Sequence, residues 1–158
     1  MRTVLFSLAA AAAAAAATIA VPAYANEGRV EARGGVVFGD GDSEGVAGIA
    51  AGYDWDLGQT LFVGAEVSGD KILEDNTRVV LGLTGRVGTK IGTGTKLYVD
   101  GGYSTKPCGA CENSIHAGAG AEFGLTDKMY GKVAYRHFFV DSGVSDYDAV
   151  FAGIGFRF

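Results

Sequence analysis

Two cysteines, Cys108 and Cys111, are separated by two residues, which is the spacing of redox dithiols, of some metal ligands and of haem attachment sites. A thioredoxin-like motif begins a helix in a βαβ unit, and no such unit is predicted around these cysteines. Haem attachment requires a histidine after the second cysteine, where this chain has Glu112. A disulfide is favoured if the chain is exported, and a metal site that includes His116 or a pair of free thiols are the alternatives.

Acidic residues that could contact a divalent cation gather in four segments expected to be loops. Residues 40–45 copy the opening of an EF-hand loop, but Ala51 occupies the position of the bidentate glutamate, so an EF-hand is excluded. The favoured interpretation is a solvated acidic rim, and a weak divalent-cation contact is the alternative. The four segments contain nine acidic and two basic residues: Asp40, Asp42, Glu44, Asp70, Glu74, Asp75, Glu112, Asp141, Asp146, Lys71 and Lys106.

Nucleic acid and nucleotide cofactors are excluded as ligands. The chain has 13 basic and 18 acidic residues, a formal charge of -5, whereas a nucleic-acid surface needs a clustered excess of Lys and Arg. The glycine-rich run at residues 92–96 lacks the Walker spacing, and no dinucleotide fingerprint is present. We therefore expect no cofactor.

The elements that must position these residues begin after a predicted signal peptide. Arg2 precedes an apolar run with nine consecutive alanines, and an Ala-x-Ala site predicts cleavage between Ala25 and Asn26. The remaining 133 residues carry twelve basic and eighteen acidic residues, a charge of -6. They contain no stretch of the roughly 18 apolar residues that a transmembrane helix needs. One exported domain, residues 26–158, is predicted.

Hydrophobicity alternates with a period of two in this domain, which predicts β-strands. One face of each segment is apolar, as at Leu81 and Leu83, and the other mixes glycine and alanine with ionisable residues, as at Gly82 and Arg86. The 26 glycines do not recur with the Gly-X-Y period, so a collagen is excluded. The hydrophobic fraction of 48% is that of a folded protein, so a disordered chain is excluded. The eight segments are residues 29–38, 46–57, 61–68, 78–88, 96–103, 115–123, 132–139 and 150–158.

These segments predict an all-β fold, an eight-stranded antiparallel up-and-down transmembrane β-barrel. An apolar outer face suits lipid, closure removes strand edges, and an eight-stranded lumen is just wide enough for side chains. The favoured role of the inner charges is an ion-pair network that plugs the lumen, and small-solute passage is the alternative. The predicted network contains fourteen residues: Arg29, Glu31, Arg33, Asp54, Asp56, Glu66, Arg78, Arg86, Lys96, Asp100, Glu122, Lys132, Arg136 and Arg157.

Aromatic residues and connection lengths give this barrel two different ends. The connections at residues 57–59, 90–94 and 126–128 are short turns, and those at residues 39–45, 69–76, 104–113 and 141–146 are longer loops. Short turns are typical of the periplasmic side and longer loops of the extracellular side. An interfacial girdle is predicted near the turns, at Tyr53, Trp55, Phe123, Phe156 and Phe158.

Residues 126–136 and the closing segment 150–158 resemble those of small outer-membrane β-barrels of Gram-negative bacteria, the opacity-like surface proteins sometimes labelled porin family. The resemblance covers nearly the whole mature chain and implies a location in the cell outer membrane, in contact with its lipid and lipopolysaccharide. It also implies an insertion signal for the barrel assembly machinery at Ile154, Phe156 and Phe158. The loops are shorter than those of adhesive members of this family, so the resemblance does not imply an adhesive function. We expect a monomer.

The expected function is structural or surface-interacting, with a narrow solute channel as the first alternative and a lipid A-modifying enzyme as the second. Some eight-stranded barrels modify lipid A with a His and Ser pair, and here Ser142 follows His137. The deacylases place the serine two residues after the histidine, where this chain has Phe139. We therefore interpret His137 as an interfacial histidine, assign no catalytic residue and no metal, and expect a non-enzyme.

Overall fold

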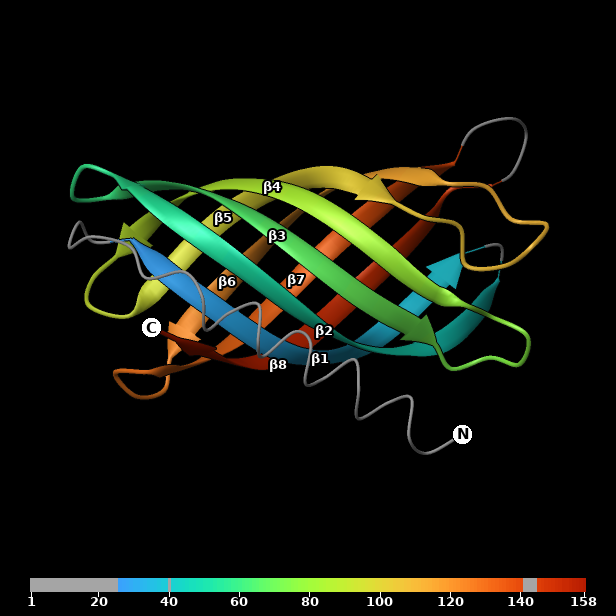
Figure 1. Ribbon diagram of the computed structural model, residues 1–158, viewed down its shortest axis with the longest axis horizontal. Helices are drawn as coiled ribbons and strands as arrows, with labels where there is room; N and C mark the ends of the chain where they lie inside the picture. Colours follow the sequence, from blue (N-terminus) through green and yellow to red (C-terminus); the bar gives the residue numbers. More distant parts are fainter. Residues whose placement is uncertain (1–25, 40, 141–144) are drawn as a thin grey trace.

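The computed structural model describes residues 26–39, 41–140 and 145–158, and the predicted signal peptide lies outside these residues. The described chain forms one closed barrel, in which each strand pairs antiparallel with the next and β1 pairs with β8 (Figure 1). The predicted fold class is confirmed. The strands are β1 (Glu27–Gly39), β2 (Asp42–Leu57), β3 (Leu61–Ile72), β4 (Val79–Ile91), β5 (Thr95–Ser104), β6 (Ser114–Gly124), β7 (Met129–Val140) and β8 (Tyr147–Arg157).

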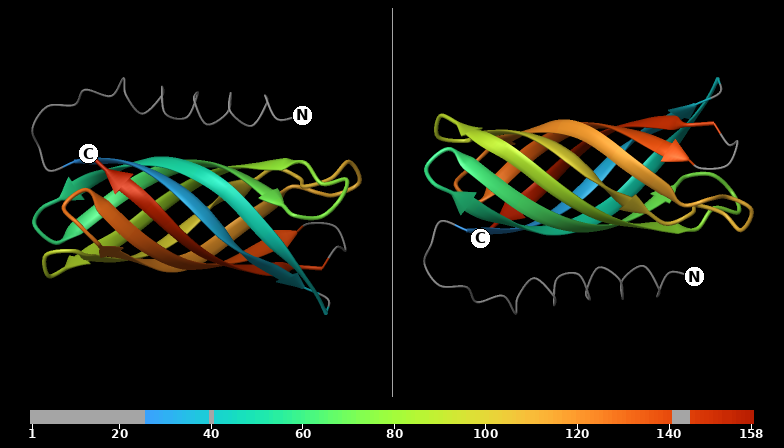
Figure 2. Two further views of the ribbon diagram at one scale, coloured as in Figure 1. Left: turned by 90° about the horizontal axis from the view of Figure 1, so that it is seen from below. Right: turned by 90° about the horizontal axis from the view of Figure 1, so that it is seen from above.

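The barrel has two ends, which we call the turn end and the loop end. The turn end carries the connections at residues 58–60, 92–94 and 125–128, and here Gly28 and Phe158 exchange two backbone hydrogen bonds of 2.9 Å that close the barrel. The loop end carries the connections at residues 73–78 and 105–113, and there β1 ends and β2 begins, and β7 ends and β8 begins. Figure 2 shows the strands running obliquely between these ends on both sides of the barrel.

Most strands are longer than the alternation of hydrophobicity predicts. The predicted loop at residues 39–45 is wrong in extent, because β1 ends at Gly39 and β2 begins at Asp42, with Gly39 and Asp42 paired in register. Gly41 makes the tight connection feasible, since its φ of 91° suits glycine. Likewise residues 69–72, predicted as loop, continue β3. Among the described residues, no helix is long and apolar enough to cross a membrane.

The two faces of the strands follow the predicted alternation. On the outer face Leu83 is 61% exposed and Val67 is 57% exposed, whereas their inner neighbours Thr84 and Glu66 are 2% exposed. The apolar side chains therefore cover the outside of the barrel, and its core consists of polar and charged side chains together with a few aromatic rings.

Inner glycines make room for three aromatic rings in the half of the lumen near the turn end. Tyr130 lies against Gly155 on the paired strand, where a Cβ atom would be 2.3 Å from the ring carbon Cζ. Tyr98 lies against Gly120 in the same way, and Phe62 lies against Gly88, where a Cβ atom would also be 2.2 Å from the backbone oxygen of Leu97. Glycine is required at these positions because the rings, and at Gly88 also the backbone, occupy the volume of the missing side chain.

We expect Gly155→Ala to lower the free energy of unfolding by about 1–3 kcal/mol, the usual cost of overpacking. The Tyr130 ring cannot easily move away, because its hydroxyl donates to Glu31 at 3.0 Å and Arg157 stacks over it at 5.1 Å. Urea unfolding in lipid vesicles, followed by the fluorescence of the single Trp55, measures the change.

Gly85→Ala is the matched control, because Gly85 faces outward and its Cβ would meet no atom closer than 3.9 Å. We expect this variant to stay within about 0.5 kcal/mol of the wild type. Equal losses for the two variants would contradict the packing argument and indicate a backbone effect common to strand glycines.

Candidate functional site

The most unusual feature of the lumen is a connected network of ion pairs that contains equal numbers of both charges. Its members come from all eight strands, and each lies within 4.0 Å of an oppositely charged member. The seven cations are Arg29, Arg33, Arg86, Lys96, Lys132, Arg136 and Arg157, and the seven anions are Glu27, Glu31, Asp54, Glu66, Asp70, Asp100 and Glu122. Equal numbers remove the net charge that would otherwise oppose burial in a narrow lumen.

Glu66 on β3 is the hub of this network, because its two carboxylate oxygens contact four cations. Arg29 Nη1 donates to Oε2 at 2.7 Å, and Arg33 Nη1 donates to Oε1 at 3.0 Å. Arg136 Nη2 donates to Oε1 at 3.1 Å, and Lys132 Nζ lies 3.5 Å from Oε2. The hub joins β1, β3 and β7, so one buried carboxylate links opposite sides of the barrel.

Arg86 on β4 forms a second centre nearer the turn end. Its guanidinium donates to both carboxylate oxygens of Asp54, through Nε at 2.9 Å and through Nη2, and Nη1 donates to Glu122. The same guanidinium lies 5.3 Å from the ring of Phe62 and 4.9 Å from that of Tyr98. Two carboxylates and two rings surround this cation, which is the packing that a planar guanidinium favours.

Three charged lumen residues were missing from the predicted set: Glu27, Asp70 and Lys90. Asp70 was expected in the acidic rim, but Arg33 holds it at the inner wall by donating from Nε at 2.8 Å and from Nη2 at 2.6 Å. Lys90 pairs with Asp56 beside the main network. All three lie an even number of residues from the inner-facing residues of their strands. Extending the alternation beyond the apolar segments would therefore have assigned them to the lumen.

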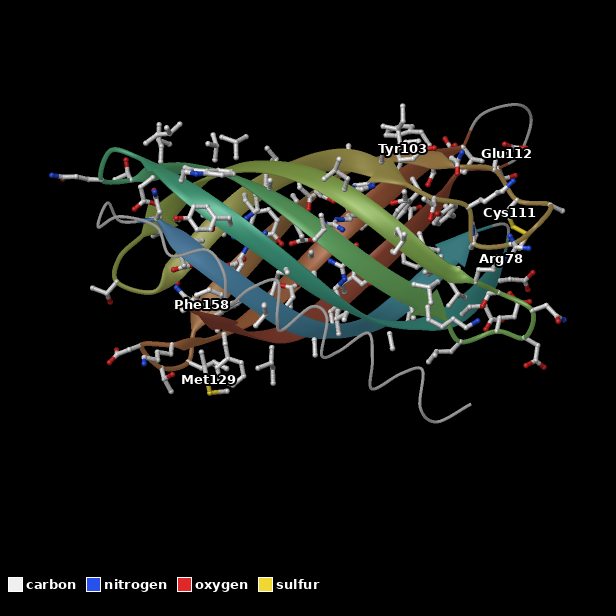
Figure 3. All side chains as sticks on the ribbon, in the orientation of Figure 1. Arg78, Tyr103, Cys111, Glu112, Met129 and Phe158 are labelled. Carbon is white, nitrogen blue, oxygen red and sulfur yellow. A yellow bond between two sulfur atoms is a disulfide. The ribbon has the colours of Figure 1, made fainter. Side chains whose placement is uncertain are left out.

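Arg78 is the one predicted lumen residue that the structure places elsewhere. It precedes β4, its side chain is exposed, and its backbone N–H donates to the carbonyl of Pro107 at 2.6 Å. Figure 3 shows Arg78 beside Cys111 at the loop end of the barrel. Arg78 has the even-numbered position of the inner-facing residues of β4, but the strand begins one residue later, at Val79. The prediction failed for this reason.

Uncharged side chains fill part of the lumen near the loop end, beside the Arg33–Asp70 pair. His116 is 1% exposed, with Nε2 3.0 Å from Thr84 Oγ1 and Nδ1 3.1 Å from Ser104 Oγ. Phe138 stacks on Tyr147 with ring centroids 4.6 Å apart. Phe138 and Tyr147 belong to a small apolar cluster that also contains Val37, Val46, Ala149 and Phe151.

Cys108 and Cys111 form a disulfide in the third loop, with Cα atoms 5.0 Å apart. The alternative metal site with His116 is wrong, because the cysteines bond to each other and the histidine is buried against Thr84 and Ser104. The parts of the chain that the structure describes contain no cluster of three or more His, Cys, Asp or Glu side chains able to hold a metal ion.

Six acidic residues remain exposed at the loop end, whereas Asp40 and Asp141 lie outside the described residues. Lys71 points toward the second loop, where Nζ donates to the carbonyl of Thr77 at 2.6 Å. A groove of about 490 Å³ opens between the third loop and β7, with Tyr103 and Glu112 among its walls (Figure 3). The exposed acidic residues are Asp42, Glu44, Glu74, Asp75, Glu112 and Asp146.

His137 lies on the outer face of the barrel with acidic neighbours. Its Nδ1 is 2.8 Å from Asp148 Oδ1, and Tyr135 donates its hydroxyl proton to the same oxygen. Phe139 packs edge-on against the imidazole ring at 4.5 Å. Ser142, which was compared with the serine of the lipid A-modifying barrels, lies outside the described residues.

Comparison with known proteins gives no match in sequence: no protein-family model and no curated protein matches the chain. Solved structures do match. The N-terminal β-barrel domain of Pseudomonas aeruginosa OprF has a TM-score of 0.60 at 15% identity, over 84% of this chain and 97% of that one. Ail, the attachment invasion locus protein of Yersinia pestis, has a TM-score of 0.56 at 17% identity over the same shares. This chain has the fold of the small eight-stranded outer-membrane β-barrels.

Two further structures show how far this likeness extends. Neisserial surface protein A matches with a TM-score of 0.56 at 13% identity, over 84% of this chain and 97% of that one. A transmembrane β-barrel designed de novo matches as well, with a TM-score of 0.57 at 17% identity, over 84% and 95%. At these identities the likeness shows a shared fold, and a fold does not by itself imply a function.

Proposed function

We propose that this protein is an outer-membrane β-barrel with a structural or surface-interacting role and a lumen plugged by paired charges. The observation that carries the proposal is the ion-pair network, in which seven cations meet seven anions across the lumen. Moving a solute through the middle would require separating several pairs, and breaking one buried pair costs about 3–5 kcal/mol.

Packing above and below the network supports a plug. Toward the turn end, Phe62 and Tyr130 are 0% exposed and Tyr98 is 5% exposed. Toward the loop end, Phe138 and Phe151 are 7% and 4% exposed. A solute would therefore have to displace side chains at three successive depths.

The outer surface supports insertion into the outer membrane. A tilted β-strand crosses a bilayer with about 9–11 residues, and the strands here have 10 to 16 residues with apolar outer faces. Ile154, Phe156 and Phe158 lie on the outer face of β8 and its end, 55%, 52% and 60% exposed, so they are accessible for the proposed role as an insertion signal for the assembly machinery. The predicted signal peptide would deliver the chain to the periplasm.

The loop end is the part that would face outward, and its charge indicates a kind of partner. Ail has been solved in complex with the heparin analogue sucrose octasulfate. The loop end here exposes six acidic residues against Lys106 and Arg78, so it disfavours polyanions and suits cationic groups, including divalent cations that bridge to lipopolysaccharide phosphates. A surface role through these loops follows from charge and not from the likeness to Ail.

A non-enzymatic role fits the same arrangement. The acceptors around His137 are Asp148 and Asp146, at 2.8 and 3.5 Å, so within the described residues the imidazole faces carboxylates and no nucleophile. The OprF domain, Neisserial surface protein A and Ail share the fold with this chain. We assign no catalytic residue.

Planar bilayer recordings test the plug. Purified protein is expected to give only rare, small current steps, because the ion pairs must rearrange before ions pass. A heat-dependent shift in gel mobility, run on the same sample, shows that the barrel is folded. Large, uniform openings from folded protein would replace the proposal with a solute channel.

A further inference from the structure

A small pocket of about 180 Å³ opens at the turn end of the lumen. Its wall contains three cations, Lys90, Lys96 and Arg157, and one anion, Glu27, together with the β4–β5 turn at residues 92–95. The surplus of positive charge is local, because the carboxylates that balance it lie deeper in the lumen or on neighbouring strands.

Two of these cations face each other directly. Lys90 on β4 and Lys96 on β5 are cross-strand partners on the inner face, a position in which like charges repel. Each ammonium group turns to different carboxylates: Lys90 pairs with Asp56, and Lys96 Nζ donates to Glu27 at 2.6 Å and to Asp54 at 3.0 Å. The two lysines remain cross-strand neighbours, so an anion between them would further reduce their repulsion.

The third cation has unused donors. Arg157 Nη1 is 3.6 Å from Glu27 Oε2, whereas Nε and Nη2 are buried and find no hydrogen-bond acceptor within the described part of the chain. Arg157 also faces another cation, Arg29, across the β1–β8 pair. Buried guanidinium donors normally have acceptors, so an acceptor oxygen beside Arg157 would stabilise this side chain.

We propose that this pocket binds a small oxyanion, a carboxylate or phosphate group, between Lys90, Lys96 and Arg157. An oxyanion would lie between the two lysines and accept hydrogen bonds from them and from the Arg157 guanidinium. The volume is below the 300 to 1,000 Å³ of usual small-molecule sites, so it suits one anionic group and not a whole cofactor.

Two aromatic rings lie beyond the cations of the pocket and limit how far an anion could enter. Lys96 Nζ lies 5.1 Å from the ring of Phe62, and the Arg157 guanidinium lies 5.1 Å from the ring of Tyr130. Both rings are fully buried. The anion therefore enters from the turn end, stops at the rings and leaves by the same route, so the pocket is a binding site and not the mouth of a pore.

Amide NMR shifts of the folded barrel in a non-ionic detergent test this site. A non-ionic detergent is required because phosphocholine headgroups would compete. Sodium phosphate and sodium acetate are titrated separately against sodium chloride at equal ionic strength. We expect saturable shifts at residues 90–96 and 157 with at least one oxyanion, and about tenfold weaker binding for Lys90→Gln, which loses one charge-assisted contact.

Two further variants make the outcome decisive. Lys128→Gln removes an exposed cation from the neighbouring turn and is expected to leave binding unchanged. Arg157→Lys keeps the charge but loses the forked donors, so it should weaken binding even if Lys90→Gln does not fold. Saturation with both anions supports a site for any small oxyanion, and saturation with one identifies phosphate or carboxylate as its chemistry. Shifts no larger than those in chloride, or equal weakening by Lys128→Gln, would overturn the proposal.

Discussion

Replacing Glu66 by glutamine is expected to lower the free energy of unfolding by about 3–5 kcal/mol, the cost of removing one partner from a buried ion pair. The glutamine has nearly the same shape, so packing is kept. Four cations, Arg29, Arg33, Lys132 and Arg136, would lose their shared anion in a site where Glu66 is 2% exposed. Urea unfolding in lipid vesicles, followed by Trp55 fluorescence, measures the loss.

Two companion variants separate charge balance from other effects of the Glu66 change. Glu44→Gln removes an exposed carboxylate at the loop end and is expected to change stability by less than about 0.5 kcal/mol. Adding Lys132→Met to Glu66→Gln makes cations and anions equal again, so the double variant should be more stable than the sum of the single changes predicts. Strict additivity would mean that the network does not act as a unit.

The alternation of hydrophobicity was sufficient to predict the strand number, the closed barrel and the two faces. It assigned Leu83 outward and Glu66 inward, because residues on one strand face share a parity whatever the register. It failed at strand ends. Beyond the apolar band the outer positions need not be apolar, so the pattern stops at Ser68 although β3 continues to Ile72.

Pairing inside the lumen could not be predicted from the sequence. Which cations meet Glu66 depends on the register of every strand pair and on the stagger with which β1 joins β8. The same holds for Tyr130 and Gly155, which meet only because β7 and β8 pair in one register. Alternation identifies inner residues, and register decides their partners.

The anion pocket illustrates this limit. Lys96 was predicted on the inner face, but Lys90 was placed in the predicted turn at residues 90–94, so the pairing of these two lysines was not predicted. That arrangement follows from the length of the turn, because β4 ends at Ile91 and β5 begins at Thr95. Within the described residues Arg157 Nε and Nη2 have no acceptor, and this follows from side-chain positions that the sequence does not specify.

The outer face gives the second large expected effect. Leu83→Arg is expected to lower the free energy of unfolding in lipid vesicles by about 2–4 kcal/mol, because a basic residue near the middle of the bilayer loses its hydration. Leu83 is 61% exposed on the outer wall, two residues from the middle of β4, so an arginine at this position would project away from the barrel. The folded fraction on unheated gels should fall together with the urea midpoint.

The control for Leu83→Arg must differ from it only in the depth of the substituted residue in the bilayer. Leu125 is 58% exposed, nearly as much as Leu83, but lies in the turn-end connection, where an arginine reaches water and should cost about 0–1 kcal/mol. Thr84→Arg is unsuitable as a control, because Thr84 is buried against His116 and arginine would be overpacked there. Equal losses for Leu83→Arg and Leu125→Arg would mean that the middle of β4 does not lie in the hydrocarbon. The membrane-spanning assignment of the outer face would then be wrong.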